Sequence, residues 1–270
     1  MGGIYRACNA ERRNVMRLLI VEGNSAEILS ANERSGAKPA WKSYAQSLQI
    51  HAADAEISVG FPYDRDREKV AADPDSFDAF VLTGSAVAWG AEAPEARPYL
   101  DYVEPLLRSG KPVLGSCWGM QTASILLGGM TGPNPNGSEI GLSRNIRLTD
   151  AGRKHALFAG MAEAFSSPTW HRDIVLRKPD GAVVLAESDI TPVQAIAYAG
   201  NGVDYMGYQF HPECELADFK TGFEARTPLP GTISETVDFP DDPPSDVADP
   251  VERTRTIGNW LAHVSTRLAR

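Results

Sequence analysis

Cysteine is scarce in this sequence, and long apolar segments are absent from it. Three cysteines, Cys8, Cys117 and Cys214, occur among 270 residues, at spacings that fit neither a disulfide framework nor a zinc site. We therefore expect a reducing compartment and no bound metal. Arg17 interrupts the early apolar segment, and no run approaches the roughly 18 residues of a membrane span. These absences predict a cytoplasmic protein without a membrane partner.

Basic residues are outnumbered by acidic ones. The 26 Lys and Arg against 35 Asp and Glu give a formal net charge of −9, which repels phosphate backbones and excludes nucleic acid as an expected partner. A hydrophobic content of 43% over 270 residues suits one large domain better than two small ones. Residues 1–15 are charged and aperiodic, so we assign them to an N-terminal extension and residues 16–270 to a single domain.

Short apolar runs alternate with helical patterns in the first half of the chain. Strands are predicted at residues 17–21, 56–61, 77–82 and 111–116, with helices at 41–50, 94–108 and 118–127. Because these strands are continuous apolar runs, they are typical of a parallel sheet that is covered on both faces. The pattern predicts an α/β fold.

The second half has a different pattern. Apolar residues alternate with polar ones over residues 140–148, and Asn201-Gly202 separates two apolar runs, which is a strong hairpin signal. These features predict an antiparallel extension of the sheet. Residues 214–250 are rich in Asp and Pro and are predicted to be a loop, whereas 251–268 have the apolar spacing of a C-terminal helix.

The segment Gly115-Ser116-Cys117-Trp118-Gly119 has the spacing of a nucleophile elbow, with a thiol in place of the hydroxyl. A lone cysteine is more often a small buried hydrophobic residue. However, Cys117 stands between a predicted strand and a predicted helix, where a sharp turn presents its side chain and the free N–H groups of the helix stabilise a thiolate. Cys117 is therefore a candidate nucleophile.

A nucleophilic cysteine requires a base, and the chain has five histidines. His211 ends the second hairpin strand, where the strand ends of an α/β sheet gather around a site. Glu213 follows two positions later and would lie on the same side of an extended segment, within reach of the imidazole. Taken singly, His211 would be an ordinary strand-end histidine and Glu213 a solvated carboxylate. Their coincidence with the elbow predicts a Cys117–His211–Glu213 triad.

These motifs resemble the class I glutamine amidotransferase domain found in GMP synthase and carbamoyl phosphate synthetase, in a stand-alone GMP synthase-like form. The similarity rests on the GSCWGMQ and FHPE segments, with VLTGS at residues 81–85, EIG at 139–141 and WHRDIV at 170–175. It extends from Arg17 to Glu213. The resemblance implies a flavodoxin-like doubly wound sheet with helices on both faces, and no cofactor.

The resemblance also implies roles for individual residues. Cys117 would attack the γ-carboxamide of glutamine, His211 would move the proton, and the N–H groups of Gly84 and Trp118 would hold the oxyanion. The residues that would contact the substrate are Ser85, Gln121, Trp170, His171, Arg172 and Asp173. The sequence departs from the family pattern at two places. The oxyanion loop, usually Gly-Gly-Pro in the family, reads Thr83-Gly84-Ser85, and Arg172 stands where the family has a glycine. The charge of Asp173 would pair with Arg172 or with the substrate.

Three functions are compatible with these residues. The first is hydrolysis of the glutamine side-chain amide through a thioester, with ammonia passed to an acceptor. Since the sequence has no Walker-type phosphate loop, an ATP-using synthetase would be a separate subunit. The second is a γ-glutamyl hydrolase or peptidase that uses the same triad. The third is a non-catalytic module that binds glutamine or a partner protein, against which the complete triad argues.

Overall fold

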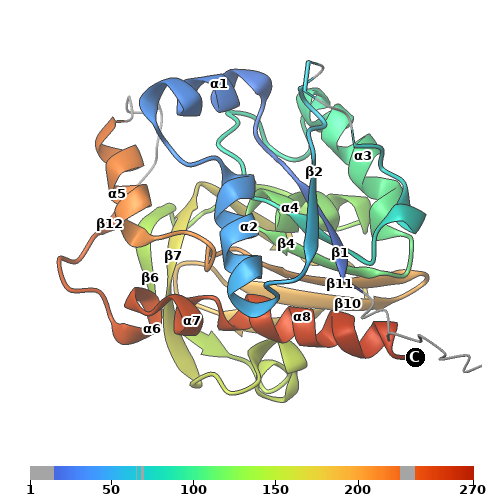
Figure 1. Cartoon of the computed structure of the whole chain (residues 1–270). Coiled ribbons are helices and arrows are strands. Elements are labelled where there is room, and N and C mark those ends of the chain that lie inside the picture. The colour runs from blue at the N-terminus through green and yellow to red at the C-terminus, as the bar shows by residue number, and fades with distance from the viewer. Residues whose placement is uncertain (1–14, 65, 68–69, 226–234) are drawn as a thin grey trace, which may run out of the picture.

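One large mixed sheet organises the molecule (Figure 1), and a separate two-stranded sheet accompanies it. The computed structural model describes residues 15–64, 66–67, 70–225 and 235–270, so the predicted extension at residues 1–15 lies almost wholly outside the described residues. The strands are β1 (Arg17–Val21), β2 (Glu56–Gly60), β3 (Ala79–Leu82), β4 (Pro112–Ser116), β5 (Met130–Pro133), β6 (Ser138–Leu148), β7 (Ala164–His171), β8 (Asp173–Arg177), β9 (Val183–Glu187), β10 (Ala195–Gly200), β11 (Val203–Tyr208) and β12 (Glu235–Asp238).

The helices alternate with the parallel strands, as the periodicity predicts. They are α1 (Ala26–Ser35), α2 (Ala40–His51), α3 (Arg97–Leu107), α4 (Trp118–Leu126), α5 (Leu216–Ala225), α6 (Ser245–Ala248), α7 (Pro250–Arg253) and α8 (Arg255–Leu268). Short 3-10 turns occur at Pro74–Ser76, Pro94–Ala96, Gly152–Lys154 and Ala156–Phe158. No helix in the described part of the chain is long and apolar enough to cross a membrane.

The strand order confirms the predicted fold class. Parallel strands run in the order β2-β1-β3-β4-β11, and β10, β9 and β6 continue the sheet with antiparallel pairing. The parallel part has the strand order of flavodoxin-like folds, and ligands of such sheets bind at the carboxyl ends of the strands. The predicted hairpin is formed by β10 and β11, with Asn201 at a positive φ of 52° in its turn.

Two apolar layers hold the helices on the sheet. Leu18 and Ile20 of β1 face α2 and α8, whereas Leu19 and Val21 face α3 and α4. Trp260 of α8 is fully buried in the first layer. Both faces of the sheet are therefore covered (Figure 1), which explains why the central strand β3 is apolar and buried at every position.

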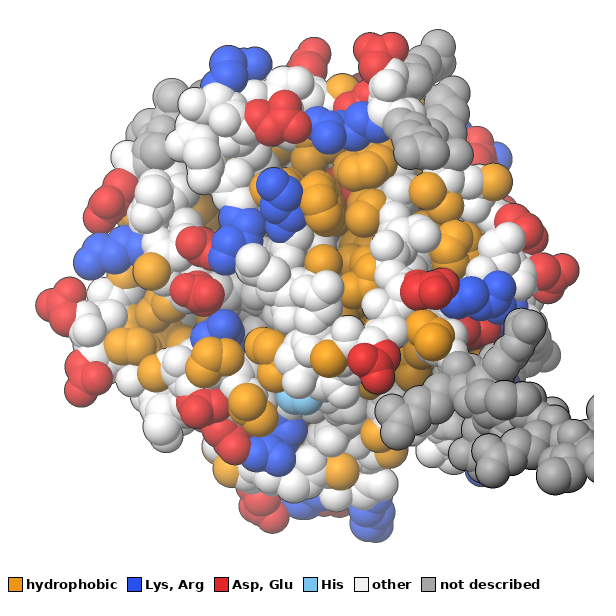
Figure 2. Space-filling model, in the orientation of Figure 1, with side chains coloured by type: hydrophobic (Ala, Val, Ile, Leu, Met, Phe, Trp, Pro, Cys, Tyr) orange, Lys and Arg blue, Asp and Glu red, His pale blue; other side chains and the backbone are white. Residues whose placement is uncertain are grey.

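Acidic and basic side chains are interspersed over the face shown in Figure 2, with hydrophobic side chains between them. The net charge of −9 is therefore not gathered into one acidic patch on that face.

The prediction of a loop over residues 214–250 is wrong in part. Helix α5 occupies Leu216–Ala225, strand β12 pairs with β6, and α6 is a short helix at Ser245–Ala248. The predicted helix at 251–268 is also divided, because α7 ends at Arg253 and α8 begins at Arg255. The loop prediction rested on the Asp and Pro residues that follow α5 and overlooked the apolar pattern of α5 itself. Phe219 and Phe223 of α5 pack against the ring of Trp170 in β7.

Candidate active site

Cys117 stands at the junction of β4 and α4, at the carboxyl edge of the parallel strands. Its backbone has a φ of 45° and a ψ of −105°, a conformation that residues other than glycine rarely adopt. A Cβ added at Gly115 would lie 2.8 Å from the carbonyl carbon of Gly119, and one at Gly119 would lie 2.3 Å from Leu82 O. The two glycines are required because strand, turn and helix approach each other too closely for side chains.

His211 and Glu213 follow β11 and reach the same edge of the sheet. The Cys117 N–H donates to Tyr208 O at 2.8 Å, and the His211 N–H donates to Pro168 O at 2.7 Å. His211 Nδ1 and Glu213 Oε1 are 2.8 Å apart, with both side chains buried. The structure thus brings the thiol segment and the histidine segment together across neighbouring strands.

The electrostatics of His211 are set by its neighbours. Burial disfavours the imidazolium, but the negative charge of Glu213 and hydrogen bonds to Cys117, Cys214 and Glu213 raise the pKa of His211 well above 6.5. Because Nδ1 is engaged with Glu213, Nε2 is the nitrogen left to exchange a proton. The Cys117 thiol is in turn 3.8 Å from Trp170 O.

Gly84 follows β3 and lies directly against the histidine. A Cβ at Gly84 would be 2.5 Å from His211 Cε1, so only glycine fits beside the ring. Within the described residues, neither the Gly84 N–H nor the Trp118 N–H donates to a protein acceptor. Among the described residues, two backbone N–H groups without a protein acceptor therefore lie at this edge of the sheet, one in the loop after β3 and one at the start of α4.

Two of the residues predicted to contact substrate, Gln121 and Ser85, form hydrogen bonds within the protein. Gln121 is buried and its Nε2 donates to Asp173 O at 2.7 Å and to Gln209 Oε1 at 3.3 Å, which leaves only its oxygen as an acceptor. Ser85 Oγ donates to Gly23 O at 2.8 Å. These side chains are held by the protein itself, so any contact with a ligand would use their remaining atoms.

The segment from Trp170 to Asp173 turns its side chains in different directions. His171 is buried with Nε2 3.3 Å from Glu139 Oε2, and although burial opposes ionisation, the hydrogen bond and charge of His171 lower the pKa of Glu139. Arg172 Nε lies 2.8 Å from Asp173 Oδ1, with the Arg172 side chain 46% exposed. The Arg172 end of this ion pair is thus exposed, whereas the Asp173 side chain is only 12% exposed.

Helix α5, which the sequence interpretation missed, forms part of the wall around the site. The Phe219 ring packs edge-on against the His211 imidazole, with a centroid distance of 5.2 Å. Phe219 also contacts the Trp170 ring at 5.8 Å. An apolar spacing of Leu216, Phe219 and Phe223 would have indicated this helix from the sequence.

Two further residues at the carboxyl end of the parallel strands were missed, namely Glu22 and Asn24. Both are buried, the Asn24 N–H donates to Glu22 Oε1, and the Ala86 N–H donates to Asn24 Oδ1. No motif identifies them, and their position after β1 is the only sequence signal that could have done so.

One cluster in the described part of the chain has the geometry to hold a metal ion. Ligand atoms of His211, Glu213 and Cys214 all lie within 4.8 Å of one another. Two of the three already pair with each other, and burial together with the Glu213 charge raises the pKa of Cys214 to about 11. His211 Nδ1 and Glu213 Oε1, two of the ligand atoms in this cluster, are thus already engaged with each other.

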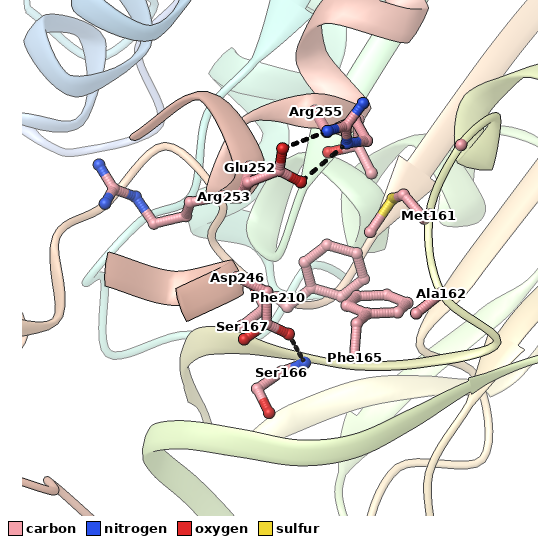
Figure 3. Close-up of a pocket in the computed structure, with 12 residues that line it drawn as sticks. Met161, Ala162, Phe165, Ser166, Ser167, Phe210, Asp246, Glu252, Arg253 and Arg255 are labelled. Atoms are coloured by element: carbon pink, nitrogen blue, oxygen red, sulfur yellow. Dashed lines mark hydrogen bonds and ion pairs between the residues drawn. The ribbon is translucent and has the colours of Figure 1, made fainter. Parts of the chain in front are cut away.

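A separate pocket of about 110 Å³ is lined by Phe210 and by residues of β7, α6, α7 and α8 (Figure 3). The Phe165 and Phe210 rings pack against each other on one side of it, 5.5 Å apart, and the Arg253 side chain extends away from them. Arg253 Nε donates to Pro212 O at 3.2 Å, which ties α7 to the residue after His211. None of the predicted site residues lines this pocket.

Comparison with known proteins identifies the family. The model of the family "Glutamine amidotransferase class-I" matches residues 42–226, and the chain belongs to this family. A gamma-glutamyl-L-1-hydroxyisopropylamide hydrolase from Pseudomonas sp is 28% identical over 206 residues, which are 73% of this chain and 68% of the relative. One subunit of a glutamine-hydrolyzing GMP synthase from Ignicoccus hospitalis is 35% identical over 143 residues, 53% of this chain and 70% of the relative.

Solved structures show the same fold. The crystal structure of a glutamine amidotransferase from Methylobacillus flagellatus superposes with a TM-score of 0.63 at 18% identity and covers 94% of each chain. The predicted family and fold class are thereby confirmed.

Proposed function

We propose that the chain hydrolyses the side-chain amide of glutamine through a thioester on Cys117, releasing glutamate and ammonia. The observation that carries this proposal is the meeting of Cys117, the His211–Glu213 pair and Gly84 at one edge of the sheet. Membership of the class I glutamine amidotransferase family supports the same chemistry.

The reaction would begin with transfer of the Cys117 proton to His211 Nε2, while Glu213 stabilises the resulting imidazolium. The thiolate attacks the γ-carbonyl carbon, and the N–H groups of Gly84 and Trp118 hold the negative oxygen. His211 then gives its proton to the leaving nitrogen, so ammonia departs and a γ-glutamyl thioester remains. Water, deprotonated by His211, adds to the thioester and releases glutamate. Each oxyanion donor would lower the barrier by about 3 kcal/mol.

A partner that uses the ammonia is part of this proposal. One relative is named as a subunit of a glutamine-hydrolyzing GMP synthase, which supports a separate ATP-using synthetase as the acceptor-side partner. Capture of a synthetase by the intact chain from a native extract would test this. A purified complex that makes its product from glutamine only with the chain present would support the pairing.

A second candidate function is hydrolysis of a γ-glutamyl amide whose nitrogen carries a substituent. It is favoured by the Pseudomonas relative, which is named for such an amide and matches 73% of this chain. The chemistry would be unchanged, except that His211 would protonate a substituted amine as it leaves. The two functions therefore differ in the leaving group alone.

The experiment compares glutamine with γ-glutamyl alkylamides as substrates of the purified chain, following glutamate release. Glutamine turnover that disappears in Cys117→Ala and persists in the control variant Cys8→Ser supports the first function. Faster turnover of an alkylamide supports the second. Binding of glutamine without turnover of any substrate, even with the captured partner added, contradicts both and leaves a binding module.

A further inference from the structure

The backbone around Gly84 is fixed by hydrogen bonds from the residues that follow β1. The Gly23 N–H donates to Thr83 Oγ1 at 2.9 Å, and Thr83 Oγ1 donates to Gly84 O at 2.9 Å. On the other side, Ser85 Oγ donates to Gly23 O at 2.8 Å. The Gly84 peptide is therefore held from both of its neighbours, and all of these atoms belong to buried or part-buried groups.

A further hydrogen bond ties this loop to Asn24, whose Oδ1 accepts from the Ala86 N–H at 2.8 Å. The two ends of an amide side chain have the same shape, so something must determine which end faces the loop. Glu22 does so, because its Oε1 accepts from Asn24 Nδ2 at 2.8 Å and from the Asn24 N–H at 2.9 Å. With Nδ2 turned to the carboxylate, Oδ1 is turned to the loop.

The requirement for a carboxylate at position 22 follows from the donors around it. Besides the two Asn24 groups, the Trp41 N–H donates to Glu22 Oε2 at 2.9 Å. Both oxygens thus face N–H donors, and the side chain is 0% exposed, so water cannot replace a lost partner. A carboxylate accepts at both oxygens, whereas an amide would place its own N–H groups against one of these donors.

From these contacts we propose that Glu22 is a positioning residue for the Gly84 loop, acting through Asn24. The inference rests on the proposed function, since the position of Gly84 matters to catalysis only if its N–H holds the oxyanion. Glu22 itself touches no reacting atom. Its effect is to keep the loop beside His211, which leaves no room for a side chain at position 84.

The test is the isosteric variant Glu22→Gln. Because the loop acts on the transition state, kcat for glutamine should fall roughly 10- to 100-fold while KM stays within about two-fold. The inhibitor glutamate γ-semialdehyde adds a direct probe, as its thiohemiacetal with Cys117 places an oxygen in the oxyanion position. Its affinity should fall by the same factor as kcat. Glu27→Gln, on the exposed side of α1, is the matched control and should leave both constants unchanged.

Two measurements keep the test decisive. Asn24→Ala removes the bond to Ala86 but keeps the Glu22 carboxylate and its bond to Trp41, so it should show the same loss of kcat even if Glu22→Gln does not fold. Thermal unfolding shows which variants are folded. A folded Glu22→Gln with the kcat of the unchanged chain, or with an equal loss in kcat and in glutamine affinity, overturns the inference.

Failure of the proposed function gives a different result. If the unchanged chain neither turns over glutamine nor forms an aldehyde adduct on Cys117, the function and the role of Glu22 both fall. If the unchanged chain is active, and Glu22→Gln and Asn24→Ala keep its kcat and its affinity for the aldehyde, then only the role of Glu22 is refuted.

Discussion

Gly84→Ala tests the contact between the oxyanion loop and the histidine. The added Cβ would lie 2.5 Å from His211 Cε1, while ordinary contact begins at 3.4 Å, so the groups must separate by about 0.9 Å (3.4 − 2.5). Neither side is free to move, because His211 is bound to Glu213 at 2.8 Å and the loop is bound to Thr83. The φ of Gly84 lies outside the left-handed region, so the substitution tests space rather than backbone strain.

A displacement of this size is costly for catalysis. Misplacement of a reacting group by about 1 Å typically lowers the rate about 100-fold, which is about 2.7 kcal/mol of barrier. We therefore expect Gly84→Ala to lower kcat for glutamine by about that factor. Ammonia release at saturating glutamine measures it. The matched control is Gly222→Ala, whose Cβ would meet the Trp170 ring at an ordinary 3.4 Å.

The reasoning would be refuted by a folded Gly84→Ala variant that turns over glutamine within about two-fold of the unchanged chain. Thermal unfolding of both glycine variants identifies a folded protein. In that case the loop would have room that the structure does not provide, and Gly84 would not lie against the histidine during the reaction.

Three further expectations follow from buried groups. Glu213→Gln removes the charge that favours the His211 imidazolium, so the pKa of His211 should move down, as NMR titration of the ring would reveal; an unchanged titration would contradict the ion pair. Since burial and the Glu213 charge raise the pKa of Cys214 to about 11, iodoacetamide should leave Cys214 unmodified at pH 7 and react with it only as the pH approaches that value, as peptide mapping would show. Trp260→Ala removes a fully buried side chain and should lower the free energy of unfolding by about 3–5 kcal/mol in a denaturant titration, with a loss under about 1 kcal/mol arguing against tight packing there.

Much of the parallel sheet is predictable from the sequence. The strands at residues 17–21 and 112–116 are continuous apolar runs, and buried strands between two helical layers need such runs. The elbow at Cys117 is equally predictable, because glycines on both sides of a strand-to-helix turn have few other uses. His211 and Glu213 are predictable from their position after a hairpin strand, and the structure places them side by side.

The remaining features depend on tertiary contacts. Helix α5 was hidden by the Pro-rich residues that follow it, although Leu216, Phe219 and Phe223 have helical spacing. Glu22 and Asn24 form no motif, and their importance appears only when the ends of β1 and β3 are seen together. Pairings across a sheet are set by topology, which local sequence patterns do not encode.

The most direct test of the central claim is detection of the acyl-enzyme. The chain is mixed with glutamine, quenched in acid within one turnover, digested and analysed by mass spectrometry. We predict that the peptide carrying Cys117 gains the mass of one γ-glutamyl group, and that Cys117→Ala yields no such adduct and no ammonia. Ammonia release by Cys117→Ala at the rate of the unchanged chain would contradict the account.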